Sequence, residues 1–170
     1  AFNNHVELIK EIINDKIKLD IIVIATPDNT HREILEYLFK MLKNENHEII
    51  IFCEKPLASN LEDACKIGKL FENSKIKIVI NHVRRWSQIW QEAYQLSKEI
   101  GEIKKAAYYF STSPENKEIV QIRDGIHIAD FINWFNIEKK TDMVRLMVPY
   151  FIHDFHLWGS RGKIEILNYN

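Results

Sequence analysis

One group of residues that could carry out chemistry surrounds a lysine. Lys55 stands between Glu54 and Pro56, directly after a run of apolar residues. A lysine at a partly buried site can exchange a proton with a substrate hydroxyl while a hydride leaves the same carbon. A Glu-Lys pair can equally belong to a solvated loop. Pro56 restricts Lys55 to extended conformations and makes a cis peptide bond conceivable between the two residues.

A histidine is the second candidate. His127 and Asp130 are three residues apart, which places them on one face of a helix. Such a histidine can be a general acid or base held by a carboxylate, or half of a metal pair. Zinc sites need three or four ligands, and no convincing third ligand is near. His153 and His156 would point to opposite faces of a strand, so we expect no metal site.

The third stretch, residues 25–31, follows another apolar run and turns at Pro27 into a helical pattern. In a doubly wound sheet, ligands bind outside the carboxyl ends of the strands, and a helix N-terminus there attracts phosphate. The stretch can also be a simple strand-to-helix turn with Asp28 or Asn29 as the helix cap.

Alternating strands and helices must position these stretches. Apolar runs rich in β-branched residues at 20–25, 48–53 and 76–80 are separated by amphipathic helical patterns, the first at 30–42. Continuous apolar strands alternating with helices indicate a parallel sheet covered on both faces, with right-handed crossovers.

The pattern changes between residues 81 and 85. An amphipathic helix begins there, and Gly101 is its natural stop signal. Strand-like segments then alternate with one further helix, which predicts an α+β arrangement with a mostly antiparallel sheet. The segments are strands at 103–112, 143–151, 155–158 and 163–167 and a helix at 122–135.

The composition excludes several classes of protein. The 170 residues carry 23 Lys and Arg against 24 Asp and Glu, so the chain has no electrostatic footprint for nucleic acid. No apolar run approaches the roughly 18 residues that span a bilayer, and we expect neither a membrane protein nor a secretory precursor. Two cysteines cannot build a disulfide framework, which favours a reducing, cytoplasmic setting.

Taken together, the motifs resemble the Gfo/Idh/MocA family, named for glucose-fructose oxidoreductase, inositol dehydrogenase and a rhizopine-catabolism protein. The resemblance implies an NAD- or NADP-dependent oxidoreductase that transfers hydride to or from a hydroxyl or keto carbon of a sugar, polyol or nucleotide sugar. The motifs are Ala-Thr-Pro-x-x-x-His at 25–31, Glu-Lys-Pro-Leu at 54–57, Asn-His-Val-Arg-Arg-Trp at 81–86, Gly-x-His-x-x-Asp at 125–130 and Gly-Ser-Arg-Gly-Lys-Ile-Glu at 159–165.

The resemblance also implies a layout and residue roles. Residues 1–83 would be the C-terminal part of a Rossmann dinucleotide-binding domain, and residues 84–170 a shortened α+β domain for substrate binding and homo-oligomerisation through its sheet. Lys55 would handle the proton, and His127 would contact the reacting hydroxyl. The cofactor would lie against Thr26, Pro27, Asn29, His31, Glu54, Lys55, Pro56 and either Arg84 or Arg85.

The chain departs from the family pattern in two places. Many members carry an aspartate four residues before the active-site histidine, where this chain has Arg123; either Asp124 substitutes for it or the catalytic chemistry is altered. Members usually begin with Gly-x-Gly-x-x-Gly, which brings backbone and a helix N-terminus to the pyrophosphate, and this chain has no such pattern. We therefore expect the first βαβ half of the domain to be absent from this chain, and the preference between NAD and NADP is not predicted.

Two other interpretations remain open. The chain can be a non-catalytic remnant that binds a sugar or a partner protein through its C-terminal sheet, which the lack of a phosphate cradle favours. It can also be a structural subunit that completes a dimer, since a parallel sheet without its first strands would expose an edge and apolar surface.

Overall fold

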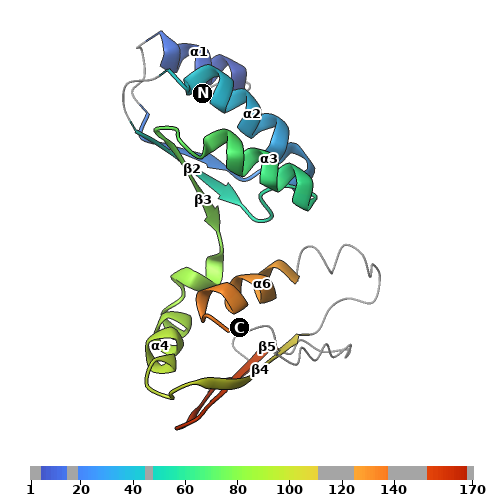
Figure 1. The fold of residues 1–170 in the computed structure, drawn as a ribbon. Coiled ribbons are helices and arrows are strands. Elements are labelled where there is room, and N and C mark those ends of the chain that lie inside the picture. The colour runs from blue at the N-terminus through green and yellow to red at the C-terminus, as the bar shows by residue number, and fades with distance from the viewer. Residues whose placement is uncertain (1–4, 15–18, 45–47, 111–124, 138–152, 168–170) are drawn as a thin grey trace. The chain divides into compact units, whose positions relative to one another are not determined.

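The computed structural model describes residues 5–14, 19–44, 48–110, 125–137 and 153–167 (Figure 1). The chain divides into two compact units, Ala1–Asn81 and His82–Asn170. Each unit has its own sheet and its own apolar core. No helix in the described part of the chain is long and apolar enough to cross a membrane.

The first unit is built around a parallel sheet in the order β1-β2-β3. The register places Ile22 beside Ile51 and Ile51 beside Ile78, so the three β-branched runs form adjacent strands as predicted. The elements are α1 (His5–Ile13), β1 (Ile21–Ile24), the short 3₁₀ helix η1 (Asp28–Thr30), α2 (His31–Leu42), β2 (Ile49–Glu54), α3 (Leu61–Phe71) and β3 (Ile76–Asn81).

All three helices of this unit cover the same face of the sheet (Figure 1). Ile49 and Ile51 point into the helical layer and are fully buried. On the opposite face Ile21, Val23 and Ile50 are 56%, 66% and 39% exposed. The expectation of a sheet covered on both faces is therefore wrong for these residues. The reason is the strand order: two successive right-handed crossovers that advance in one direction leave their helices on one side.

The second unit contains an antiparallel sheet in the order β4-β5-β6. Its core is aromatic: Trp90 stacks on Phe131 with ring centroids 4.2 Å apart, and Phe155 lies 5.1 Å from each of them. Such ring pairs add about 0.5–1.5 kcal/mol beyond the burial of their area. The elements are η2 (Val83–Trp86), α4 (Gln88–Ser97), β4 (Ile103–Phe110), α6 (Gly125–Trp134), β5 (His153–Gly159) and β6 (Lys163–Ile166).

Two glycines shape the turn that leads into β4. Gly101 has a φ of 80°, a left-handed conformation that glycine adopts without steric cost, and it follows α4 where the sequence predicted a stop. A Cβ on Gly159 would clash with the carbonyl oxygen of Ile100, so a larger residue there would displace the backbone.

The fold class predicted from the sequence is confirmed: a partial Rossmann-type parallel sheet is followed by a unit with an antiparallel sheet. Element ends differ by a few residues, as for β5, which begins at His153 rather than at residue 155. The last two residues of the expected strand at 103–112 lie outside the described residues. The expected strand at 143–151 and the start of the expected helix at 122–124 lie outside the described residues.

Candidate active site

The carboxyl ends of β1 and β2 lie side by side. Ile24 is paired with Cys53 at the end of the parallel ladder, so the segments that follow both strands leave the same edge of the sheet. These segments are residues 25–31 and 54–57, the two motifs that sequence reasoning selected in this unit. Ligands of open α/β sheets bind at this edge.

His31 joins the two segments. Its side chain is buried, and its two ring nitrogens face two different backbone carbonyls. Nε2 lies 2.8 Å from the carbonyl oxygen of Thr26, and Nδ1 lies 2.8 Å from that of Pro56, 25 residues along the chain. The ring therefore fixes the spacing between the segment after β1 and the segment after β2.

The segment after β1 presents exposed residues on a short, hydrogen-bonded turn. Thr26, Pro27 and Asn29 are exposed, while the Thr30 hydroxyl lies 2.8 Å from Thr26 Oγ1 and donates to the Pro27 carbonyl at 2.7 Å. Neither Asp28 nor Asn29 caps α2, since both belong to η1 and Thr30 occupies the N-cap position without a side-chain cap bond. The capping role considered for Asp28 or Asn29 from the sequence is thus wrong.

The segment after β2 carries Lys55. The peptide bond between Lys55 and Pro56 is cis, as the sequence made conceivable. The amide of Asn81, at the end of β3, donates to Glu54 Oε1 at 2.6 Å, which fixes that carboxylate at the edge of the sheet. Lys55 is half-buried between these anchored neighbours.

A buried thiol lies directly behind this edge. Burial, and secondarily the negative charge of Glu54, raise the pKa of Cys53 to about 11. The Cys53 side chain is fully buried, so at neutral pH it is an uncharged member of the core.

In the second unit, an ion pair fixes helix α6 to the η2 turn. Arg85 donates from Nε and Nη2 to Asp130, with Nη2 to Oδ1 at 2.7 Å and Nε to Oδ1 at 3.0 Å. His82 Nδ1 lies 3.6 Å from the same carboxylate, and the Arg85 guanidinium lies over the Trp134 ring at 5.4 Å. His127 is half-buried on this helix.

Sequence reasoning overlooked the Arg85–Asp130 pair. The spacing of Asp130 from His127 suggested that this carboxylate holds the histidine, whereas the structure places the Arg85 guanidinium on it. The available signal was the second arginine of the Asn-His-Val-Arg-Arg-Trp motif. Arg84, the other predicted cofactor residue of this motif, has its guanidinium 5.6 Å from the Tyr108 ring and 5.9 Å from the Phe131 ring.

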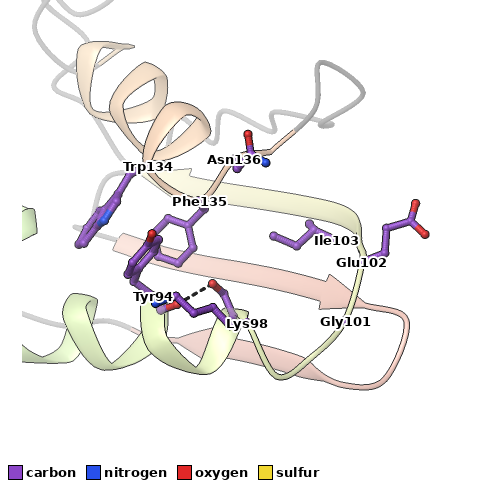
Figure 2. Close-up of a pocket in the computed structure, with 9 residues that line it drawn as sticks. Tyr94, Lys98, Gly101, Glu102, Ile103, Trp134, Phe135 and Asn136 are labelled. Carbon is purple, nitrogen blue, oxygen red and sulfur yellow. Dashed lines mark hydrogen bonds between the residues drawn. The ribbon is translucent and has the colours of Figure 1, made fainter.

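A hollow of about 380 Å³ lies elsewhere in the second unit, near the ends of α4 and α6 (Figure 2). Tyr94 stacks on Trp134 with centroids 5.3 Å apart, and Lys98 Nζ lies 4.7 Å from the centre of the Tyr94 ring. None of the residues predicted to bind cofactor or react with substrate lines it. This hollow is therefore not the candidate active site.

The remaining predicted residues are distributed between the units. Lys55 belongs to the first unit and His127 to the second. Asp124 and Arg123 lie outside the described residues. Within the described ranges, no group of three or more His, Cys, Asp or Glu side chains could hold a metal ion.

Comparison with known proteins agrees with this arrangement. Residues 1–82 match the profile of the Gfo/Idh/MocA oxidoreductase family, described as having an NAD-binding Rossmann fold. A 2,7-anhydro-N-acetylneuraminate hydratase from Escherichia coli is 32% identical over 94 residues, which are 54% of this chain and 23% of that protein. An uncharacterized oxidoreductase from Schizosaccharomyces pombe is 26% identical over 166 residues, 85% of this chain and 43% of its own length.

Solved structures share the fold. The myo-inositol 2-dehydrogenase of Lactobacillus plantarum is 18% identical, with a TM-score of 0.72 over 97% of this chain and 61% of that one. An oxidoreductase from Sinorhizobium meliloti is 15% identical, with a TM-score of 0.78 over 98% of this chain and 56% of that one. The chain thus spans less than two thirds of the length of these relatives. Residues 1–82, just under half of the chain, thus match the Gfo/Idh/MocA family of oxidoreductases, whose Rossmann fold binds NAD(P).

Proposed function

We propose that this chain carries the nicotinamide side and the substrate side of an NAD(P)-dependent oxidoreductase that acts on a sugar, polyol or nucleotide sugar. The observation that supports this most is the edge where β1 and β2 end together. There His31 holds the segment of Thr26 and the segment of Lys55 at fixed spacing. The family's NAD-binding Rossmann fold gives this edge its ligand class.

The residues present fit one end of the cofactor. Exposed Thr26, Pro27 and Asn29, together with Glu54 and Lys55, stand at the carboxyl edge, where the nicotinamide and its ribose would be held. The pyrophosphate end has no counterpart, because the only glycine among residues 1–81 is Gly68, which lies within α3. The bound cofactor would accept or supply the hydride.

We assign the proton chemistry to three residues. Lys55, half-buried beside the anchored Glu54 carboxylate, would exchange a proton with the substrate hydroxyl as its carbon is oxidised or reduced. His127 would contact that hydroxyl from α6, and Asp124 would support it in place of the usual aspartate. Arg84 or Arg85 would border the nicotinamide; both are half-buried.

Turnover of a substrate panel tests these roles. Polyols, aldoses and nucleotide sugars are offered with NAD and with NADP, and product is followed together with the absorbance of the reduced cofactor. Lys55→Ala is expected to abolish turnover while leaving the circular dichroism spectrum unchanged. Lys69→Ala, which removes an exposed lysine on α3, is the matched control and should have no effect. Near-normal turnover by Lys55→Ala would reject the role of Lys55.

A second activity is favoured by one relative. The Escherichia coli protein that shares 32% identity over 94 residues is named a hydratase, so its net reaction adds or removes water. For this chain the same residues could serve a net hydration or elimination on a sugar derivative. The two outcomes differ in the assay, since a dehydrogenase accumulates reduced cofactor with product, whereas a net hydratase forms product without it.

A non-catalytic binding role remains the alternative for a chain without a phosphate cradle. Complete absence of turnover with every substrate, combined with saturable binding of a sugar or of a partner protein, would favour that alternative.

We place either activity in the cytoplasm, since the exposed Cys65 and buried Cys53 are both free thiols.

We also propose that the outer face of the antiparallel sheet forms a homo-oligomer interface. On this face Tyr109, His156 and Trp158 lie in a row, with successive ring centroids 5.4 Å and 5.5 Å apart. Lys105 Nζ lies 5.3 Å from the centre of the Trp158 ring. Trp158→Glu should lower the association state in sedimentation, whereas Leu96→Glu, on exposed α4 surface, should not. An unchanged association state in Trp158→Glu would exclude this interface.

A further inference from the structure

We propose that His31 is a positioning residue for Lys55, acting through the Pro56 backbone and not through contact with cofactor or substrate. The proposal rests on the role assigned above to Lys55. His31 is the first residue of α2, and its side chain is only 1% exposed. It is thus a buried, titratable group that the proposed chemistry does not otherwise use.

The ring has no nitrogen left for a ligand. Each of its two nitrogens lies 2.8 Å from a backbone carbonyl oxygen, one from Thr26 and one from Pro56. Carbonyl oxygens only accept hydrogen bonds, so each contact is a bond when that nitrogen carries a hydrogen. A neutral ring donates to one carbonyl, and a doubly protonated ring donates to both. In either state both nitrogens face the backbone.

Holding the Pro56 carbonyl restrains Lys55. Proline has a fixed φ and no N–H, so the Pro56 residue adds little freedom between its own carbonyl and the preceding peptide bond. Lys55 is the residue on the other side of that bond. The other ring nitrogen of His31 contacts the carbonyl of Thr26. The Thr26 hydroxyl lies 2.8 Å from the Thr30 hydroxyl on the turn before α2. Proton transfer is sensitive to displacements of about 1 Å, so such a restraint would matter for the rate.

Three variants separate this role from general support of the fold. His31→Phe keeps a ring but removes both ring nitrogens, and His31→Gln keeps an amide donor that can restore one contact. Leu35→Ala is the matched control, because Leu35 is fully buried one turn further along the same helix. The measurements are amide hydrogen exchange across the chain and the rate of Lys55 amine modification relative to exposed Lys69, each as a function of pH.

The proposal predicts a local effect. His31→Phe should raise exchange about tenfold in residues 25–31 and 54–58 only, and should shift the pH profile of Lys55 modification, with His31→Gln in between. Leu35→Ala should raise exchange throughout the first unit without changing the Lys55 profile. If His31→Phe raised amide exchange equally throughout the first unit, or left the pH profile of Lys55 modification unchanged, the positioning role would be overturned.

A measurement on the unaltered chain covers the case in which His31→Phe does not fold. The ring N–H of His31 should give a slowly exchanging proton signal in ¹H–¹⁵N spectra, and a rapidly exchanging ring would overturn the proposal. None of these readouts requires cofactor or turnover. Failure of the positioning role is therefore distinguishable from failure of the proposed function, which the turnover of Lys55→Ala decides.

Discussion

Arg85 donates hydrogen bonds from two of its nitrogens to the carboxylate of Asp130, which is only 8% exposed. The pair joins two segments that are 45 residues apart in the chain, the η2 turn and helix α6. Because His127 lies on the same helix, this ion pair sets the orientation of the helix that carries a proposed catalytic residue.

Removing the arginine should destabilise the second unit. Arg85→Met leaves the buried Asp130 carboxylate without its main donor, which costs about 1.5–3 kcal/mol in the free energy of unfolding measured with urea. The double variant Arg85→Met with Asp130→Leu should recover most of the loss, since no uncompensated charge remains. Arg161→Met, at an exposed position, is the control, and an equal loss in that variant would refute a specific role for the pair.

The two cysteines should differ sharply in reactivity. Cys65 is exposed, whereas Cys53 is buried and its pKa is raised to about 11. Iodoacetamide at pH 8 is therefore expected to label Cys65 and to spare Cys53, as mass spectrometry of the tryptic peptides would show. Labelling of both thiols at similar rates would contradict the burial of Cys53.

The same shift predicts a pH dependence of stability. A pKa raised from 9.0 to about 11 on folding means that the native state keeps its proton where the unfolded chain has lost it. The contribution of the Cys53 thiol to the free energy of unfolding is complete below pH 9 and is lost as the pH rises through 11. Subtracting the unfolding free energies of Cys53→Ala isolates it, with an expected change of about 2–3 kcal/mol. A difference that stays constant from pH 8 to 11 would contradict the shift.

The open face of the parallel sheet should drive self-association. Val23 and Ile21 are 66% and 56% exposed on β1, which is an edge strand of the sheet in the part of the chain that the structure describes. Val23→Lys should lower self-association in sedimentation at constant protein concentration and change the unfolding free energy by no more than about 0.5 kcal/mol. A monodisperse, reversibly melting monomer for the unaltered chain would contradict this expectation.

Local patterns predicted the strands well because their signal is contained in a few adjacent residues. The run from Ile49 to Cys53 is apolar at every position, which is typical of a parallel strand between two amphipathic helices. The pattern could not show that one face stays open, since that depends on strand order. Order is set by contacts between segments, not by the composition of each.

Contacts between residues far apart in the chain were the second feature that the sequence patterns could not predict. The spacing of His127 and Asp130 favoured a pair within one helix, but a guanidinium from 45 residues earlier takes the carboxylate. His31 was expected at the cofactor because the family resemblance implies that position for it. Its contact with the Pro56 carbonyl, which places it beneath the loop, becomes visible only when β1 and β2 are paired.

Binding of cofactor fragments tests the central proposal most directly. The ¹⁵N-labelled chain would be titrated with NADH, with reduced nicotinamide mononucleotide and with AMP, and amide shifts would be followed by residue. Because the residues present fit only the nicotinamide end, NADH and the reduced mononucleotide should move the amides of residues 26–31 and 54–55, and AMP should not. No shifts with either nicotinamide compound, or shifts confined to other residues, would contradict a cofactor site at the shared edge of β1 and β2.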